Sequence, residues 1–228
     1  MRKTLINEIL ALVLFFLAAC SNDEPEVSPV VAGDYPVKEY ALERDPNVNV
    51  WGAGMDFIHT GTDTVDYAYL SETDDFPYDL KFYTVKAYYT TSAGETASEG
   101  CPAMLLASST LGCKIGEGLT FFDTCSVITV EMQEALAFES VIDYSVCKNA
   151  DGTYSRDSLF ASFDKCIIGR SFRSGVLIIP DGKTETEVQP VYLLKTYEGG
   201  LVKFMVKQFK GDAPNQKQTI VRWQVVSE

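Results

Sequence analysis

Short runs in which apolar and polar side chains alternate dominate the chain from about residue 36 onward, and turn residues separate them. In the first half of the run 202–208, apolar and polar residues alternate, which indicates a β-strand with one face in water. The run 191–196 precedes it across the turn sequence Glu198-Gly199-Gly200, and the run 221–225 follows it. This pattern predicts three consecutive antiparallel strands at the C-terminus.

Earlier segments also predict strands. Residues 78–89 carry aromatic and β-branched side chains at both alternations, which is typical of a strand that is covered on both faces or meets a ligand with one of them. Residues 51–58 and 64–70 flank a polar, glycine-containing loop and predict a hairpin. Residues 175–179 form an apolar run that stops at Pro180, which predicts a short buried strand.

Only two segments favour a helix. Residues 131–139 are good helix formers apart from Phe138, and residues 158–165 carry apolar side chains at helical spacing behind Asp157, a candidate N-cap. Neither segment is long. We therefore predict a mainly β fold, a single antiparallel β-sandwich or barrel-like domain over residues 36–228 with one or two short helices.

The N-terminus has the pattern of an export signal. Arg2 and Lys3 precede an apolar stretch that runs from Ile9 to Ala19. As a helix this stretch would span roughly 16 Å, about half of the roughly 30 Å hydrocarbon core of a bilayer. Residues 1–19 therefore predict a signal peptide and not a membrane span.

The signal ends in Leu17-Ala18-Ala19-Cys20, which resembles the lipobox of bacterial lipoproteins. In those signals the cysteine is acylated, so the resemblance implies lipidation at Cys20 and attachment to a membrane. The alternative is an ordinary secretory signal in which Cys20 is incidental, since small residues before the cleavage site suit either peptidase.

Residues 20–35 are polar, acidic and interrupted by prolines, and they predict a flexible tether between the lipid and the folded body. The acidic cluster behind Cys20 resembles the export signal of surface lipoproteins in anaerobic Gram-negative bacteria, although a solvated spacer has the same composition. We therefore expect an outer-membrane lipoprotein that is exposed at the cell surface.

Composition excludes several functions. The chain has 228 residues with 19 Lys+Arg against 32 Asp+Glu and a formal net charge of -13, which argues against nucleic acid as a partner because phosphate binding needs clustered basic side chains. The single histidine, His59, excludes three-histidine zinc sites and bis-histidine haem ligation. No Gly-x-Ser-x-Gly elbow is present that would give His59 a catalytic triad.

Beyond Cys20, the cysteines are Cys101, Cys113, Cys125, Cys147 and Cys166. None belongs to a CxxC pair, so their spacing is poor for a zinc or iron–sulfur site. The spacing does not assign disulfide partners. Disulfides, which an exported location favours, and buried free thiols acting as small apolar side chains are both open alternatives.

Acidic residues offer no clear catalytic or metal-binding motif. A carboxylate pair that acts as acid and base favours apolar surroundings, and only Asp79 and Asp143 have apolar neighbours in the sequence. Asp56, Asp63 and Asp66 resemble a calcium loop only loosely, since the regular spacing and closing glutamate of an EF-hand are absent. We expect a solvated loop there and predict that the protein is not an enzyme.

Large apolar side chains gather in residues 78–89 and in shorter runs such as 121–122. Each of them can belong to the core, but pockets for flat hydrophobic ligands have the same composition. Because thioether sulfur can ligate haem iron axially, the candidate axial ligands by chemistry alone are Met104 and Met132, with Tyr154 as a third.

Several features together resemble the HmuY-type haem-binding lipoproteins. These are the lipoprotein start, the segment 76–82 leading into Val85-Lys86, the segment 120–124 after a glycine-rich stretch, and the C-terminal hairpin 191–204. The resemblance implies a non-catalytic surface protein that captures haem and passes it to an outer-membrane receptor.

The chain also departs from that family. The loop of residues 180–183 contains neither the histidine nor the methionine that family members use on loops of the second half, and Tyr78 stands where the family favours tryptophan. Two alternatives therefore stay open: a glycan-binding accessory surface lipoprotein that presents Trp51 and tyrosines to sugar rings, and a structural or adhesion β-domain whose aromatic side chains are all core.

Overall fold

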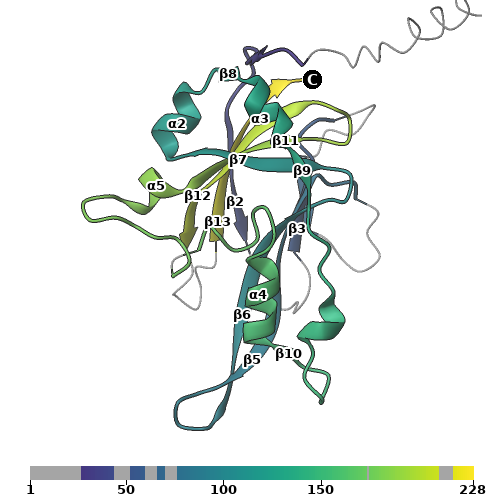
Figure 1. Cartoon of the computed structure of the whole chain (residues 1–228), viewed down its shortest axis with the longest axis vertical. Coiled ribbons are helices and arrows are strands. Elements are labelled where there is room, and N and C mark those ends of the chain that lie inside the picture. Colours follow the sequence, from purple (N-terminus) through teal and green to yellow (C-terminus); the bar gives the residue numbers. More distant parts are fainter. Residues whose placement is uncertain (1–26, 44–51, 60–65, 70–75, 174, 211–217) are drawn as a thin grey trace, which may run out of the picture.

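The computed structural model describes residues 27–43, 52–59, 66–69, 76–173, 175–210 and 218–228, and Figure 1 shows how its elements are arranged. The fold is mainly β, as predicted. The strands are β1 Val30–Val31, β2 Lys38–Glu43, β3 Gly52–Met55, β4 Tyr67–Tyr69, β5 Leu80–Thr90, β6 Thr96–Leu106, β7 Leu111–Glu117, β8 Val127–Ile128, β9 Ala137–Phe138, β10 Tyr154–Ser155, β11 Pro190–Lys195, β12 Leu201–Lys210 and β13 Gln218–Ser227. The described helices are α2 Leu119–Thr124, α3 Val130–Glu134, α4 Arg156–Phe163, α5 Glu185–Val188 and the 3-10 turn η1 Tyr144–Cys147.

A six-stranded antiparallel sheet has the order β2-β13-β12-β11-β7-β9. Its centre is the C-terminal meander β11-β12-β13, in which Tyr192 pairs with Phe204 and Phe204 with Trp223. The predicted C-terminal strands are thus confirmed. The prediction that the run 202–208 has one face in water was wrong: residues 201–206 are buried on both faces, because Met205 and Val191 pack against Phe122 of α2 on the side opposite the main core, and Lys203 is buried as well.

A second sheet has the order β10-β5-β3-β4, with β6 also paired to β5. The predicted hairpin of β3 and β4 is confirmed, with Gly54 opposite Ala68. In Figure 1 the long β5–β6 pair extends away from the six-stranded sheet, and α4 and β10 lie beside it.

The two faces of β5 serve different cores. Leu80 and Phe82 join Phe204 and Trp223 in the main core, to which both sheets contribute. The alternate residues, among them Tyr83, pack with the side chains of α4 in a second core. Because successive side chains of a strand point to opposite faces, the aromatic run is covered on both sides, which was one of its two predicted roles.

The helices differ from the prediction in number and extent. Four short α-helices lie in the described part of the chain, not one or two. The segment 131–139 is helical only as far as Glu134 and ends in the short strand β9, which pairs with β7. Helix α4 begins earlier than expected because the hydroxyl of Ser155 accepts from the Ser158 N–H, so Ser155 is the N-cap and Asp157 lies in the first turn.

The prediction of a buried strand at 175–179 was wrong. The segment forms a turn, one bridge residue at Leu177 and irregular chain, and Ile178 is 86% exposed. Gly175 has a φ of 86°, a left-handed conformation that glycine adopts freely and that interrupts a strand. An apolar run alone did not distinguish a buried strand from an exposed loop.

The tether was predicted to extend to residue 35, but the chain contacts the folded body before that residue. Val30 pairs with Ile128 in the β1–β8 ladder, and the backbone of Gly33 donates to the carbonyl of Val226.

All five described cysteines are free thiols, so the alternative without disulfides holds in this structure. No helix of the described residues is long and apolar enough to cross a bilayer.

Candidate functional site

Neither predicted sulfur ligand faces a described cavity. Met104 lies on β6, is 0% exposed and is enclosed by the main core. Met132 lies on α3 and packs, half-buried, against a separate cluster around Ile128. Iron needs a donor that can be reached by a planar ligand, so these positions do not favour Met104 and Met132 as axial ligands.

An apolar cavity of about 270 Å³ lies against the face of β5 and β6 that η1 and β10 approach. We call it the tyrosine pocket, because four of its lining residues are tyrosines. Its walls are Tyr78, Lys81, Tyr83, Val85, Leu105, Leu106, Tyr144 and Tyr154. The predicted second role of the aromatic run, one face against a ligand, therefore has a cavity that could serve it.

Strand register explains why these residues meet. Lys81 lies directly opposite Leu105 in the β5–β6 ladder, so both side chains emerge on one face of the pair. Tyr154 comes from β10, which pairs in parallel with β5. Its ring meets that of Tyr144 edge to face, with centroids 6.3 Å apart, and closes the far side of the pocket.

Two polar groups on the β5 wall have no partner in the described part of the chain. The hydroxyl of Tyr83 is buried and forms no hydrogen bond. The ammonium of Lys81 has no described hydrogen-bond acceptor or acidic partner and lies 5.3 Å from the centroid of the Tyr83 ring. Burial without a compensating charge lowers the pKa of Lys81.

The phenol of Tyr144 is a neutral hydrogen-bond donor at the pocket. Burial, followed by the nearby thiols of Cys166 and Cys147, raises the pKa of Tyr144 well above its ordinary value. Its hydroxyl therefore stays protonated at neutral pH. Tyr154 carries the ammonium of Lys148 5.6 Å from its ring centroid, which places a positive charge near the pocket.

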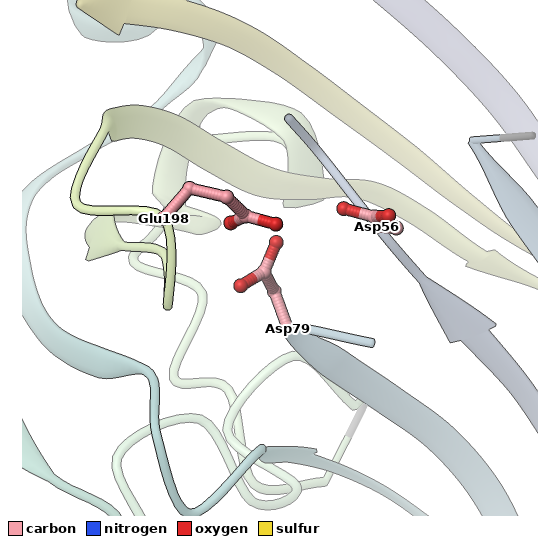
Figure 2. A group of neighbouring side chains, drawn as sticks. All are labelled: Asp56, Asp79 and Glu198. Atoms are coloured by element: carbon pink, nitrogen blue, oxygen red, sulfur yellow. The ribbon is translucent and has the colours of Figure 1, made fainter. Parts of the chain in front are cut away.

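A second site is a group of three carboxylates, Asp56, Asp79 and Glu198, which we call the carboxylate triad. One oxygen from each lies within 4.8 Å of the others. Asp56 follows β3, Asp79 precedes β5, and Glu198 stands in the turn between β11 and β12, and Figure 2 shows the three side chains converging. The triad therefore joins the two sheets at one end of the main core.

Sequence reasoning found parts of this second site and missed the whole. Asp79 was correctly singled out by its apolar neighbours and is 0% exposed, but Asp143 is exposed and caps η1 by accepting from the Ser145 N–H. Asp56 was assigned to a solvated loop and is 2% exposed. Glu198 gave no signal, because its turn sequence fits any hairpin. Asp63, like Trp51, lies outside the described residues.

No protein-family model, no curated protein and no solved structure matches this chain. The HmuY-type resemblance therefore stays a prediction. The same holds for the lipid anchor at Cys20 and the outer-membrane location, since Cys20 lies outside the described residues.

Proposed function

We propose that this protein is a non-catalytic binding protein that captures a flat, apolar, acid-bearing ligand in the tyrosine pocket, and that this ligand is haem. The observation that carries the proposal is an aromatic cavity whose wall holds the buried, unpaired hydroxyl of Tyr83 beside the half-buried ammonium of Lys81, which has no described acceptor. Buried polar groups in folded proteins almost always have partners. Groups that lack one on a pocket wall are the natural contacts of a ligand.

The chemistry of the pocket suits a porphyrin edge. Aromatic and aliphatic side chains supply apolar area, and Lys81 supplies a cation for a propionate. The cavity of about 270 Å³ lies just below the range of roughly 300–1,000 Å³ that encloses drug-sized ligands. It would therefore hold one side of the macrocycle and leave the rest in contact with the surface.

Iron ligation in this proposal falls to a phenol. Tyrosine is an axial haem ligand in some proteins, and Tyr154, the third candidate from the sequence, lines the pocket, unlike Met104 and Met132. Anchoring through Cys20 and transfer of haem to an outer-membrane receptor belong to the same proposal and rest on sequence alone.

A glycan is the second candidate, because four tyrosine rings around one cavity also offer stacking surfaces to a sugar. The two ligands differ in their need for a cation. Haem binding would depend on Lys81, whereas a neutral sugar would lose affinity with the rings and tolerate loss of the lysine charge.

The test is a titration of the purified protein with haemin, followed by visible absorbance. We expect a shifted Soret band in the wild type and binding weakened by about 10-fold in Lys81→Met, since a charge-assisted hydrogen bond contributes about 1.5–3 kcal/mol. Tyr83→Phe should weaken binding less. Tyr154→Phe should alter the band position if its phenol ligates the iron.

Matched controls lie on the same strand. Lys86 is exposed and also stands near a tyrosine ring, with its ammonium 5.5 Å from the Tyr88 centroid, but neither residue lines the pocket. Lys86→Met and Tyr88→Phe should bind haemin like the wild type. An unchanged Soret band on titration, or equal losses in Lys81→Met and Lys86→Met, would remove the proposal.

A further inference from the structure

The carboxylate triad is independent of the tyrosine pocket, and its three members share no lining residue with it. Asp79 is well satisfied: Oδ1 accepts from the Thr110 hydroxyl at 3.0 Å and the Tyr197 N–H at 3.3 Å, and Oδ2 accepts from the Phe57 N–H at 3.2 Å. These bonds hold one carboxylate firmly at the end of β5.

The other two members are not satisfied. Oδ1 of Asp56 and both carboxylate oxygens of Glu198 are buried and form no hydrogen bond in the described part of the chain. The whole Asp56 residue is 2% exposed, and Figure 2 shows its carboxylate facing the oxygens of Asp79 and Glu198. Three carboxylate oxygens without donors face one another, and a shared proton, a bound water or a cation would satisfy them.

The ion pairs of the structure also leave the three carboxylates without a compensating charge. No described lysine or arginine forms an ion pair with Asp56, Asp79 or Glu198. The imidazole of His59 lies close to the triad, with its Nδ1 3.6 Å from Oδ2 of Asp56. Its other ring nitrogen is engaged by Asp66 at 2.9 Å, so His59 is shared between two acidic sites.

We infer that Asp56, Asp79 and Glu198 bind a hard divalent cation of the calcium type. The three carboxylates offer oxygen donors only, with no thiol in the group, and Ca²⁺ takes about 6–8 oxygen ligands in flexible geometry. Mg²⁺ demands a nearly ideal octahedron and is therefore the weaker candidate for ligands drawn from separate loops.

The position of the triad gives the cation a structural task. Asp56 and Asp79 belong to the sheet of β3 and β5, while Glu198 belongs to the turn of the six-stranded sheet. A bound cation ties the two sheets together at this end of the main core. Binding to the folded state alone raises the unfolding temperature in proportion to the logarithm of cation concentration above its Kd.

The experiment uses the full protein freed of metal with EGTA, then titrated with CaCl₂, with the thermal unfolding midpoint and binding heat as readouts. The decisive variant is Glu198→Gln, which keeps the side-chain size and removes no hydrogen bond to the protein. The matched control is Glu95→Gln, an exposed residue of the β5–β6 turn. Asp56→Asn is a second variant of the triad.

We expect a saturable rise of the unfolding midpoint with Ca²⁺ in the wild type and in Glu95→Gln, and affinity at least 10-fold weaker in Glu198→Gln and Asp56→Asn. Mg²⁺ should produce a smaller rise at equal concentration. Absence of both heat and a midpoint shift in the wild type would overturn the inference and assign the triad to shared protons. An equal Ca²⁺ response in Glu198→Gln and Glu95→Gln would also overturn it.

Discussion

The region around α2 holds a buried lysine and the wall of the tyrosine pocket holds a half-buried one, and the two differ in their hydrogen-bond partners. Lys203 is 2% exposed, and its ammonium donates to the carbonyls of Phe122 at 2.9 Å and Cys125 at 2.7 Å, at the C-terminal end of α2. That position also suits the helix dipole. Lys81 has no described acceptor. A buried charge with its acceptors in place stabilises the fold, whereas a half-buried ammonium without an acceptor on a cavity wall is available to a ligand.

Asp66 and Asp56, which both lie near His59, differ in the same way in their hydrogen-bond donors. Asp66 accepts from Lys38 and Tyr40 at 2.6 Å each and contacts His59 at 2.9 Å. Burial on its own raises the pKa of Asp66, but these hydrogen bonds outweigh it and lower the pKa below the ordinary value. Asp56 is more deeply buried than Asp66 and lacks lysine and tyrosine donors, and its pKa moves upward.

The largest expected effect is the loss of the satisfied lysine. Lys203→Met leaves the carbonyls of Phe122 and Cys125 without their donor, so we expect the free energy of unfolding to fall by about 2–4 kcal/mol. Urea unfolding followed by circular dichroism measures it. Lys207→Met is the control, because its exposed ion pair with Glu39 contributes about 0–1 kcal/mol. Equal losses of unfolding free energy in Lys203→Met and Lys207→Met would contradict a special structural role for Lys203.

Within the carboxylate triad, the satisfied member should matter more for stability than an unsatisfied one. Asp79→Asn replaces an acceptor by a donor that faces other donors, and we expect the free energy of unfolding to fall by about 2 kcal/mol. Asp56→Asn, measured by urea unfolding in EGTA at pH 8, should be neutral or stabilising. A larger loss for Asp56→Asn would show that the orphaned oxygen has a partner after all.

Stability should depend on pH through Asp56. Burial, followed by the charges of Asp79 and Glu198, raises its pKa from 3.8 to about 6. The folded state therefore holds this proton more tightly than the unfolded chain, so the stabilisation is complete below about pH 4 and is lost as the pH rises through about 6. In EGTA, the wild type should lose on the order of 2 kcal/mol relative to Asp56→Asn between pH 4 and pH 7. Parallel pH profiles would contradict this assignment.

The smallest effect is expected at the unsatisfied lysine. Lys81→Met removes a charge that burial has already made unfavourable, so without ligand we expect the free energy of unfolding to rise by up to about 1 kcal/mol. The same substitution weakens haemin binding, as proposed above. A variant that is more stable but binds haemin less tightly is typical of a residue kept for binding. If Lys81→Met destabilised the unliganded protein, Lys81 would instead be a structural residue like Lys203.

Strands that pair with the next strand along the sequence were the predictable part of the fold. The C-terminal meander and the β3–β4 hairpin followed from alternation and turn residues. Strand β6 was missed because Gly100 and Pro102 interrupt its pattern. Among the described strands it pairs with β5, and on its other side it has a single bridge from Met104 to Gly169. On such an edge a proline leaves no ladder hydrogen bond unmade.

The candidate sites were less predictable than the strands. Chemistry alone proposed sulfur ligands, but a methionine on a strand is as suitable for core packing as for ligation, and Met104 packs in the core. Tyr78 and Tyr154 were noticed separately, and no spacing in the sequence relates them to Lys81. Their meeting depends on the parallel pairing of β10 with β5.

The order of apolar and polar residues by itself determined the fold class, the local hairpins and the acidic character of this protein, because those properties depend on neighbours in the chain. Only the tertiary structure decided which polar groups lose water together. Asp56, Asp79 and Glu198 are ordinary acids in sequence and become costly only when packing excludes solvent around all three. Desolvation is a property of the assembled surroundings, so the groups that call for a ligand appear after the sheets have packed.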